Sequence, residues 1–453
     1  MIPSSRQNPA SVIVGLGDTG FSCARYFIRH SRQFRVVDTR PHPPRLADLA
    51  NLKPDVEVEL GEFRAERLLE ARELVVSPGV DLRTPALAAA ARAGVPITGD
   101  IDIFSREARS PIVAVTGSNG KSTVVAMLAG ILDQANVNYG LGGNLDGRLF
   151  RPALDLLEEE RDWYLLEISS FQLETTQQLN ADVALILNIS PDHLDRYDSL
   201  DDYTRAKQRI FRGCSRIVLN RDEPCSRPPD SAAAPVISYG LDAPAPGQAG
   251  LLPLDGERWL ASGNQRYLPV QALKMPGDHN VSNALAAMAL ALAMGVEREH
   301  IVAGLAAFAG LPHRCQWVAT RVGVDYYNDS KATNVGAAAA AVRNLAADRA
   351  GRVLLIAGGV GKDADFAPLA PAMRESARAA VLIGRDADRI AAALEPEIPL
   401  FFADTLDEAV STARNQALPG DAVLLSPACA SFDMFENFQH RGESFIRCVE
   451  GLQ

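Results

Sequence analysis

The stretch IVAVTGSNGKST, residues 112–123, decides the fold class of this chain. A β-branched run ends in glycines and leads into a helix-forming segment, which is the order of a strand, a phosphate-binding loop and a helix. Glycines let backbone N–H groups approach phosphate oxygens, Lys121 can reach the β- and γ-phosphates, and the Ser122 hydroxyl can hold Mg²⁺. The loop is a variant, because Val115 stands where the first glycine of G-x-x-x-x-G-K-[ST] would fall. The predicted phosphate site comprises Gly117, Ser118, Asn119, Gly120, Lys121, Ser122 and Thr123.

Two further strand-and-glycine openings lie on either side, SVIVGLGDTG from Ser11 and RVLLIAGGVGKDADF from Arg352. Short apolar runs alternate with Ala-rich helical stretches, which predicts α/β domains with parallel sheets. Strands are expected at 34–38, 74–77, 163–168, 183–188, 216–220, 381–384 and 422–426, and helices at 85–93, 123–135 and 281–293.

The length of 453 residues predicts about three domains. Pro96–Asp100 and Gly310–Pro312 are plausible junctions, because Pro and Gly interrupt helices and strands. The expected division is therefore 1–99, 100–311 and 312–453. Residues 224–267 are rich in Pro, Gly and Ala and are expected to form an irregular or β-hairpin insertion in the middle domain.

Charge and composition exclude several classes of partner. The formal net charge of −11 argues against sequence-independent nucleic-acid binding and against docking on an anionic membrane. The most apolar stretch, Ala284–Gly295, is about half as long as a membrane-spanning helix needs. The N-terminus does not resemble a signal peptide, and the six scattered cysteines suit a reducing compartment. The expected location is the cytoplasm, with small-molecule partners only and a monomeric state.

The first glycine loop, Gly15–Gly20, matches G-x-G-x-x-G, and Asp38 ends the next expected strand. This pattern is typical of a dinucleotide site in which the acidic residue binds a ribose. The same backbone can hold any diphosphate, so NAD(P), another nucleoside diphosphate and a purely structural turn all remain open at this point.

Three side chains in the middle of the chain are candidates for chemistry. Glu167 lies at the end of an expected strand and could complete a Mg²⁺ site with Ser122, or could be a solvated edge residue. His193 lies between Asp192 and Asp195 after another strand, and could be a ligand or a satisfied polar group. Lys207, on an expected helix over 203–211, has no evident partner and by itself is most simply a surface lysine.

Taken in order, the motifs resemble the Mur ligase family of peptidoglycan synthesis, and its D-glutamate-adding members most. The resemblance covers nearly the whole chain. It rests on GSNGKST at 117–123, GGN at 142–144, EISSFQL at 167–173, 188–197, AK at 206–207, GDHN at 277–280, LPHR at 311–314, DSKATN at 329–334, GG at 358–359, KDADF at 362–366 and LSPACAS at 425–431.

The resemblance implies a Rossmann-like N-terminal domain, a central P-loop-type ATP-binding domain and a Rossmann-like C-terminal domain. It implies that ATP activates the carboxylate of UDP-N-acetylmuramoyl-L-alanine as an acyl phosphate, which the D-glutamate amine then attacks. Lys121, Glu167, His193 and Lys207 would be the catalytic residues. Two Mg²⁺ ions are implied, held by Ser122, Glu167, His193 and Lys207, with a carbamate on Lys207.

The resemblance also assigns the remaining binding residues. The UDP-substrate would be held by Gly17, Asp18, Thr19, Asp38, Thr39, Arg40, Ser77, Pro78, Gly79 and Asn144. ATP would contact Asn280, Arg314, Asp329 and Lys331 as well as the phosphate loop. D-Glutamate would be held by Thr333, Lys362, Ser431 and Phe438.

Three rival hypotheses differ in what they bind. A sister amino-acid-adding ligase or a folylpolyglutamate synthetase relative would use another amino acid. An NAD-dependent oxidoreductase would bind nicotinamide without hydrolysing a nucleotide. A non-catalytic nucleotide-binding module would not need Lys121, Glu167, His193 and Lys207 together.

Overall fold

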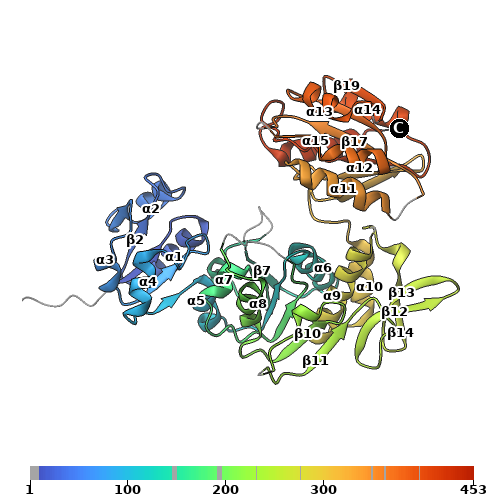
Figure 1. Ribbon diagram of the computed structural model, residues 1–453. Coiled ribbons are helices and arrows are strands. Elements are labelled where there is room, and N and C mark those ends of the chain that lie inside the picture. The colour runs from blue at the N-terminus through green and yellow to red at the C-terminus, as the bar shows by residue number, and fades with distance from the viewer. Residues whose placement is uncertain are drawn as a thin grey trace, which may run out of the picture. The chain divides into compact units, whose positions relative to one another are not determined.

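The computed structural model describes residues 10–144, 150–190, 196–230, 232–275, 277–347, 350–361, 364–396 and 398–452. The described chain contains three mixed or parallel sheets with helices around them, so the predicted α/β class is confirmed (Figure 1). It separates into two compact units, Met1–Leu268 with Asn283–Gly304, and Pro269–Ser282 with Leu305–Gln453. Each unit is described by itself.

The first sheet, blue in Figure 1, has the strand order β3-β2-β1-β4-β5, and its pairs are parallel. Alternate residues of β1 face opposite sides: Ile13 packs with helix α1, whereas Val12 and Val14 pack with α3 and α4. The elements are β1 Ser11–Val14, α1 Asp18–Arg29, β2 Phe34–Asp38, α2 Leu46–Leu52, β3 Val58–Leu60, α3 Ala65–Leu69, β4 Leu74–Val76, α4 Pro85–Arg92 and β5 Ile97–Thr98.

The central sheet has nine strands in the order β14-β13-β12-β11-β10-β9-β6-β8-β7. Strands β7, β8, β6, β9 and β10 are parallel, so their carboxyl ends meet at one edge. The strands are β6 Ile112–Thr116, β7 Tyr139–Gly143, β8 Trp163–Glu167, β9 Val183–Ile186, β10 Arg216–Asn220, β11 Val236–Tyr239, β12 Gln248–Leu254, β13 Glu257–Ser262 and β14 Gln265–Pro269. The helices in this part of the chain are α5 Asp100–Glu107, α6 Lys121–Gln134, α7 Ser170–Glu174, α8 Leu200–Gln208, α9 Asp278–Met294 and α10 Arg298–Ala307.

The insertion predicted at 224–267 extends this sheet. Strands β12 and β13 form an antiparallel hairpin, and β11 joins it to β10. The hairpin alternative is therefore confirmed. The expected strands at 163–168, 183–188 and 216–220 correspond to β8, β9 and β10.

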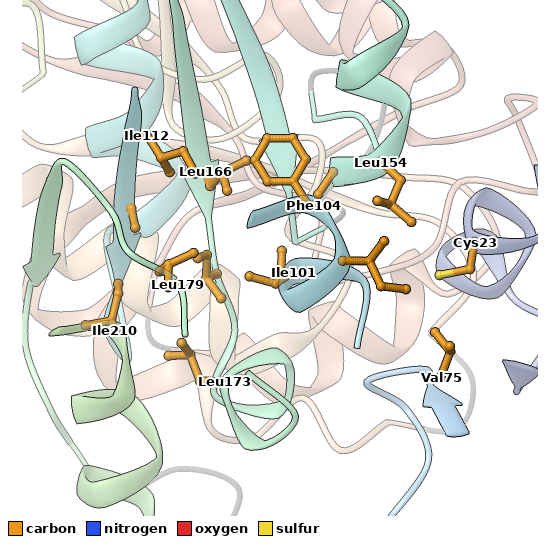
Figure 2. Close-up of a cluster of buried hydrophobic side chains, with 14 of the residues drawn as sticks. Cys23, Val75, Ile101, Phe104, Ile112, Leu154, Leu166, Leu173, Leu179 and Ile210 are labelled. Carbon is orange, nitrogen blue, oxygen red and sulfur yellow. The ribbon is translucent and has the colours of Figure 1, made fainter. Parts of the chain in front are cut away.

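One hydrophobic cluster joins the first and central sheets (Figure 2). Cys23 and Val75 come from the first sheet and its helix, whereas Ile112 and Leu166 come from the central sheet. Helix α5 supplies Ile101, Ile103 and Phe104 to this cluster, and all three are at most 1% exposed. These two parts of the unit therefore share one continuous core.

The third sheet, in the second unit, has the order β15-β16-β20-β17-β18-β19 and is parallel except for the β15–β16 pair. Helices α11–α13 pack on one face and α14 and α15 on the other. The elements, orange to red in Figure 1, are β15 Gln316–Arg321, β16 Val324–Asn328, α11 Val335–Ala347, β17 Val353–Gly358, α12 Leu369–Ser376, β18 Ala377–Ile383, α13 Ala387–Leu394, β19 Leu400–Ala403, α14 Leu406–Gln416, β20 Ala422–Leu425 and α15 Phe438–Glu450.

Candidate active site

The loop between β6 and α6 has the conformation that only glycine adopts easily. Gly120 caps α6 with a φ of +84°, and a Cβ there would approach Asn283 Oδ1 to 2.6 Å. The loop is braced by the segment after β9, because the Ser118 and Asn119 amides donate to the backbone oxygen and the Oδ1 of Asn188, at 3.0 and 2.9 Å. This fixed backbone at a helix N-terminus is suited to binding phosphate.

Lys121 is the first residue of α6, and its side chain turns back toward the loop. Nζ donates to the carbonyl oxygens of Gly117 and Ser118 at 2.9 and 3.0 Å. The ammonium therefore lies over the loop, where a bound phosphate chain would meet it. The structure brings all seven predicted phosphate-loop residues into this one turn.

The carboxylate of Glu167 connects the phosphate loop to a neighbouring strand end. Ser122 Oγ donates to Oε2 at 2.6 Å, and Asn144 Nδ2 donates to Oε1 at 2.8 Å. Glu167 ends β8 and is 2% exposed. The alternative of a solvated edge glutamate is therefore wrong. A hydroxyl and a carboxylate side by side are the hard oxygen donors that Mg²⁺ prefers.

Lys207 is buried against the phosphate loop. It is 1% exposed, and Nζ lies 2.9 Å from the Gly117 carbonyl oxygen and 3.4 Å from Thr116 Oγ1. Its Nζ also faces the ring of Tyr203, 4.6 Å from the centroid, and the Tyr203 hydroxyl lies 3.2 Å from Ser118 Oγ. The interpretation of Lys207 as a surface lysine is therefore wrong, because the helix face that carries it packs on the loop.

The predicted metal site has one member outside the described residues, His193. Among the residues that the structure describes, no group of three His, Cys, Asp or Glu side chains forms a metal cluster. The candidate ligands that the structure describes are Ser122 and Glu167, which share a hydrogen bond, and Lys207, whose Nζ contacts the Gly117 oxygen.

A cleft of about 440 Å³ lies at the carboxyl edge of the first sheet. All ten residues predicted to bind the UDP-substrate line it: Gly17, Asp18, Thr19, Asp38, Thr39, Arg40, Ser77, Pro78, Gly79 and Asn144. The other lining residues are Gly15, Phe63, Val80, Gly143 and Gln172. Asn144 thus faces this cleft and also contacts Glu167.

Asp38 is committed to contacts within the protein. Oδ2 accepts from the Leu16 amide and from Arg40 Nη2, both at 2.6 Å, and Oδ1 accepts from the Arg40 amide and Nε, both at 2.9 Å. Burial alone would raise the pKa of Asp38, but the Arg40 and Leu16 bonds outweigh it and hold the pKa below its ordinary value. Because both carboxylate oxygens of Asp38 are engaged, the ribose contact that is typical of a dinucleotide site is disfavoured. Arg40 is half exposed and lines the cleft.

In the second unit, the carboxyl ends of β16, β20 and β17 bring three predicted motifs together. The Ser426 hydroxyl donates to Asp329 Oδ2 at 2.7 Å, and the Ala428 amide donates to the Ala332 oxygen at 3.0 Å. Burial raises the pKa of Asp329 to about 6, although the Ser426 bond opposes this. Lys331 Nζ lies 5.8 Å from the Phe438 ring centroid.

The other residues predicted for this unit differ in exposure. Asn280 and Ser431 are buried, whereas Arg314 and Thr333 are exposed. Lys362 lies outside the described residues.

Three residues that the sequence analysis did not single out complete these sites. Asn188 and Tyr203 hold the phosphate loop. Arg441, 1% exposed on α15, donates to Ser330 Oγ and to the oxygens of Ser330 and Cys429, so it ties the loops after β16 and β20 together. Burial lowers the pKa of Arg441 to about 10. One arginine within an amphipathic helix carries no signal of such a role.

These features are those of a nucleotide-binding α/β protein with a phosphate loop and a separate cleft at the edge of the first sheet, called the diphosphate cleft after the ligand that its glycine loop predicts. Family models match along the chain: the Mur ligase MurD-like N-terminal domain over residues 9–99, the Mur ligase middle domain over 115–291 and the Mur ligase glutamate ligase domain over 313–429. The chain belongs to the Mur ligase family.

Similar proteins of known name support this membership. UDP-N-acetylmuramoylalanine–D-glutamate ligase of Pseudomonas aeruginosa is 53% identical over 441 residues, which are 97% of this chain and 98% of the relative. The protein of the same name from Pseudomonas fluorescens is 50% identical with the same coverage.

Solved structures show the same fold at low identity. A UDP-N-acetylmuramoyl-L-alanyl-D-glutamate–2,6-diaminopimelate ligase gives a TM-score of 0.58 at 18% identity, over 100% of this chain and 98% of that one. UDP-N-acetylmuramate–alanine ligase from Thermotoga maritima gives 0.54 at 19%, over 98% and 99%. The three matched family domains correspond to the three sheets.

Proposed function

We propose that this protein is an ATP-dependent ligase that joins D-glutamate to UDP-N-acetylmuramoyl-L-alanine, forming ADP and phosphate. One observation carries the proposal: Ser122, Glu167 and Asn144 form a hydrogen-bonded row from the phosphate loop to the diphosphate cleft. A nucleotide on the loop and a UDP-substrate in the cleft would thus be adjacent. The two full-length relatives carry the name of this activity.

The chemistry requires charge neutralisation and alignment. The alanyl carboxylate attacks the γ-phosphorus of ATP, and ADP leaves. The D-glutamate amine then adds to the acyl carbon, loses a proton, and inorganic phosphate leaves with the C–O bond pair. Lys121 would offset charge on the transferring group, and the loop amides would orient it. Asn144 would hold the UDP-substrate by hydrogen bonds.

The described donors fit a divalent cation at the phosphate loop. Ser122 and Glu167 would hold one Mg²⁺, and His193 with Lys207 would hold a second. Bound Mg²⁺ would neutralise the phosphate charge. Lys207 would act as a carbamate. A carbamate forms when a neutral amine adds to CO₂, and burial of Lys207 favours the neutral form of its amine. The contacts described for Lys207, to a carbonyl and a hydroxyl, also suit the unmodified side chain, so modification needs a direct test.

The remaining assignments belong to the same proposal. ATP would be bound by Asn280, Arg314, Asp329 and Lys331. The two carboxylates of D-glutamate would be bound by Thr333, Lys362, Ser431 and Phe438. The domains would divide at residues 99 and 311. The enzyme would work in the cytoplasm as a monomer. Every helix among the described residues is too short or too polar to span a bilayer.

The decisive test is phosphate release from ATP with UDP-N-acetylmuramoyl-L-alanine and a panel of amino acids. D-Glutamate should support turnover, and D-glutamine or L-alanine should support it far more weakly, because a neutral analogue leaves a charged pocket unpaired. Equal rates with L-alanine would assign the chain to a sister ligase instead.

A further inference from the structure

Arg196 occupies an unusual position between the diphosphate cleft and the central sheet. Its side chain is 10% exposed. One guanidinium nitrogen, Nη1, donates to the Pro78 oxygen at 3.3 Å, and Nη2 donates to the Val80 oxygen at 3.1 Å and to Glu174 Oε2 at 2.7 Å. The planar guanidinium spreads these three bonds over two nitrogens in a fixed geometry, which the single ammonium nitrogen of a lysine does not reproduce.

The two carbonyls belong to the turn after β4, which forms one wall of the diphosphate cleft. Ser77 Oγ donates to the Gly15 oxygen at 3.0 Å, so the turn also holds the first glycine loop. The position of this turn therefore sets the shape of the cleft. Arg196 comes from a different domain and fixes the turn from outside.

The other contacts of Arg196 lead toward the phosphate loop. Its guanidinium lies over the Phe171 ring, 4.5 Å from the centroid, and Phe171 stacks on Tyr197 at 6.1 Å. Tyr197 packs on Tyr203 at 5.2 Å. Tyr203 contacts Ser118 and Lys207, as described above. An unbroken chain of packed side chains thus runs from the cleft wall to the phosphate loop.

We propose that Arg196 is a positioning residue that couples occupancy of the diphosphate cleft to nucleotide binding at the phosphate loop. The inference rests on the proposed function, because it takes the UDP-substrate as the occupant of the cleft. A ligand that presses on the Ser77–Val80 turn shifts the Arg196 anchor, and the aromatic contacts transmit that shift to Tyr203. Coupling of this kind is reciprocal: each ligand raises the affinity for the other by the same factor.

The test compares the wild type with Arg196→Met, Arg196→Lys and a control, Arg205→Met. Methionine keeps an unbranched apolar side chain but removes the guanidinium and all its donors; lysine keeps the charge but not the planar fork. Arg205 is a 67% exposed arginine of α8 that pairs with Asp202. Calorimetry measures the affinity for a non-hydrolysable ATP analogue with and without UDP-N-acetylmuramoyl-L-alanine. It also measures the affinity for UDP-N-acetylmuramoyl-L-alanine with and without the ATP analogue. Steady-state kinetics and melting temperature are recorded in parallel.

We expect the wild type and Arg205→Met to show equal coupling factors in both directions. Arg196→Met should lose the coupling and raise KM for the UDP-substrate by about tenfold to a hundredfold, the range for removing bonds to a buried charge, with ATP affinity in its absence unchanged. Arg196→Lys should be intermediate. Coupling intact in both Arg196 variants, or an equal loss of every affinity with a lower melting temperature, would overturn the inference. Absence of ligation by the wild type would instead refute the proposed function.

Discussion

Ser122 and Glu167 are 45 residues apart in sequence, yet their side chains form a buried 2.6 Å hydrogen bond between the phosphate loop and the end of β8. The bond exists because β6 and β8 are adjacent and parallel, with Val115 paired to Glu167. Under the proposed function, this carboxylate would lie beside the phosphates of the bound nucleotide. Its removal should therefore affect chemistry more than folding.

Glu167→Gln is expected to lower turnover by about 10²–10³-fold, the usual range for one electrostatic group at a reacting phosphate. The amide keeps the size of the side chain but not its charge, so more Mg²⁺ should be needed for half-maximal activity. The measurement is phosphate release over a Mg²⁺ titration. Glu160→Gln, an exposed site in the preceding loop, is the control and should be unchanged. A normal Mg²⁺ requirement in Glu167→Gln would show that the carboxylate only shapes the loop.

Lys121→Ala should lower turnover by at least about 10³-fold, because it removes the cation that lies over the loop carbonyls. The melting temperature should stay close to that of the wild type, since the side chain is only partly buried. Lys53→Ala, which removes a lysine at the end of α2, is the matched control. Near-normal rates in Lys121→Ala would make the lysine structural.

Lys207 offers a test that separates a cation from a carbamate. Guanidinium takes up no CO₂ and repels Mg²⁺, so Lys207→Arg should be nearly inactive if the carbamate is required. Lys207→Ala should also be inactive, but formate or acetate in the resulting space should restore part of its activity. The same anions should not help Lys207→Arg.

A direct measurement accompanies this pair. A crystal structure, or an intact mass taken without acidification, should show one added carboxyl group on Lys207. An active Lys207→Arg enzyme would remove the carbamate from the mechanism. It would leave the contacts to Gly117 and Thr116 as the function of the ammonium.

Asp100 should make stability depend on pH. It is 2% exposed, Oδ2 accepts from Gln172 Nε2 at 3.0 Å, and Oδ1 has no hydrogen-bond partner among the described residues. Burial raises the pKa of Asp100 from 3.8 to about 6. The folded state therefore binds the proton more tightly than the unfolded state. Its contribution to stability is full below pH 3.8 and is lost as pH rises through about 6.

Asp100→Asn should remove this dependence. The difference in free energy of unfolding, variant minus wild type, should rise by about 2 kcal/mol between pH 4 and pH 7.5. Urea titrations at four pH values measure it. Asp255→Asn, in an exposed turn, is the matched control. A difference for Asp100→Asn that does not change with pH would mean that its carboxyl is solvated or paired.

The sequence predicted the positions of candidate site residues better at the ends of strands than on helices. The phosphate loop follows β6, Glu167 is the last residue of β8 and Asn144 follows β7. Parallel strands place their carboxyl ends together. Lys207 and Tyr203 could not be placed in this way. Which helix face packs inward depends on the neighbouring loop, and the pattern of α8 gives no indication that a lysine is buried.

The same limit explains Arg441 and Arg196. Each bonds mainly to backbone oxygens, which every residue has, so no partner can be recognised from residue types. The insertion at 224–267 was ambiguous because Pro and Gly obscure strand periodicity. The structure resolves it as β-strands that lengthen the central sheet.

The hydrophobic cluster in Figure 2 determines how the first domain can be studied. A fragment that ends at the expected boundary after Gly99 would lack α5, and Cys23 and Val75 would lose the covering that Ile101 and its neighbours provide. Exposed apolar surface of this kind favours aggregation. Ligand titrations on such an isolated fragment would therefore report on a damaged protein. A fragment extended through Ala307, the end of α10, would retain both sheets of the shared core with α9 and is the smaller unit to express.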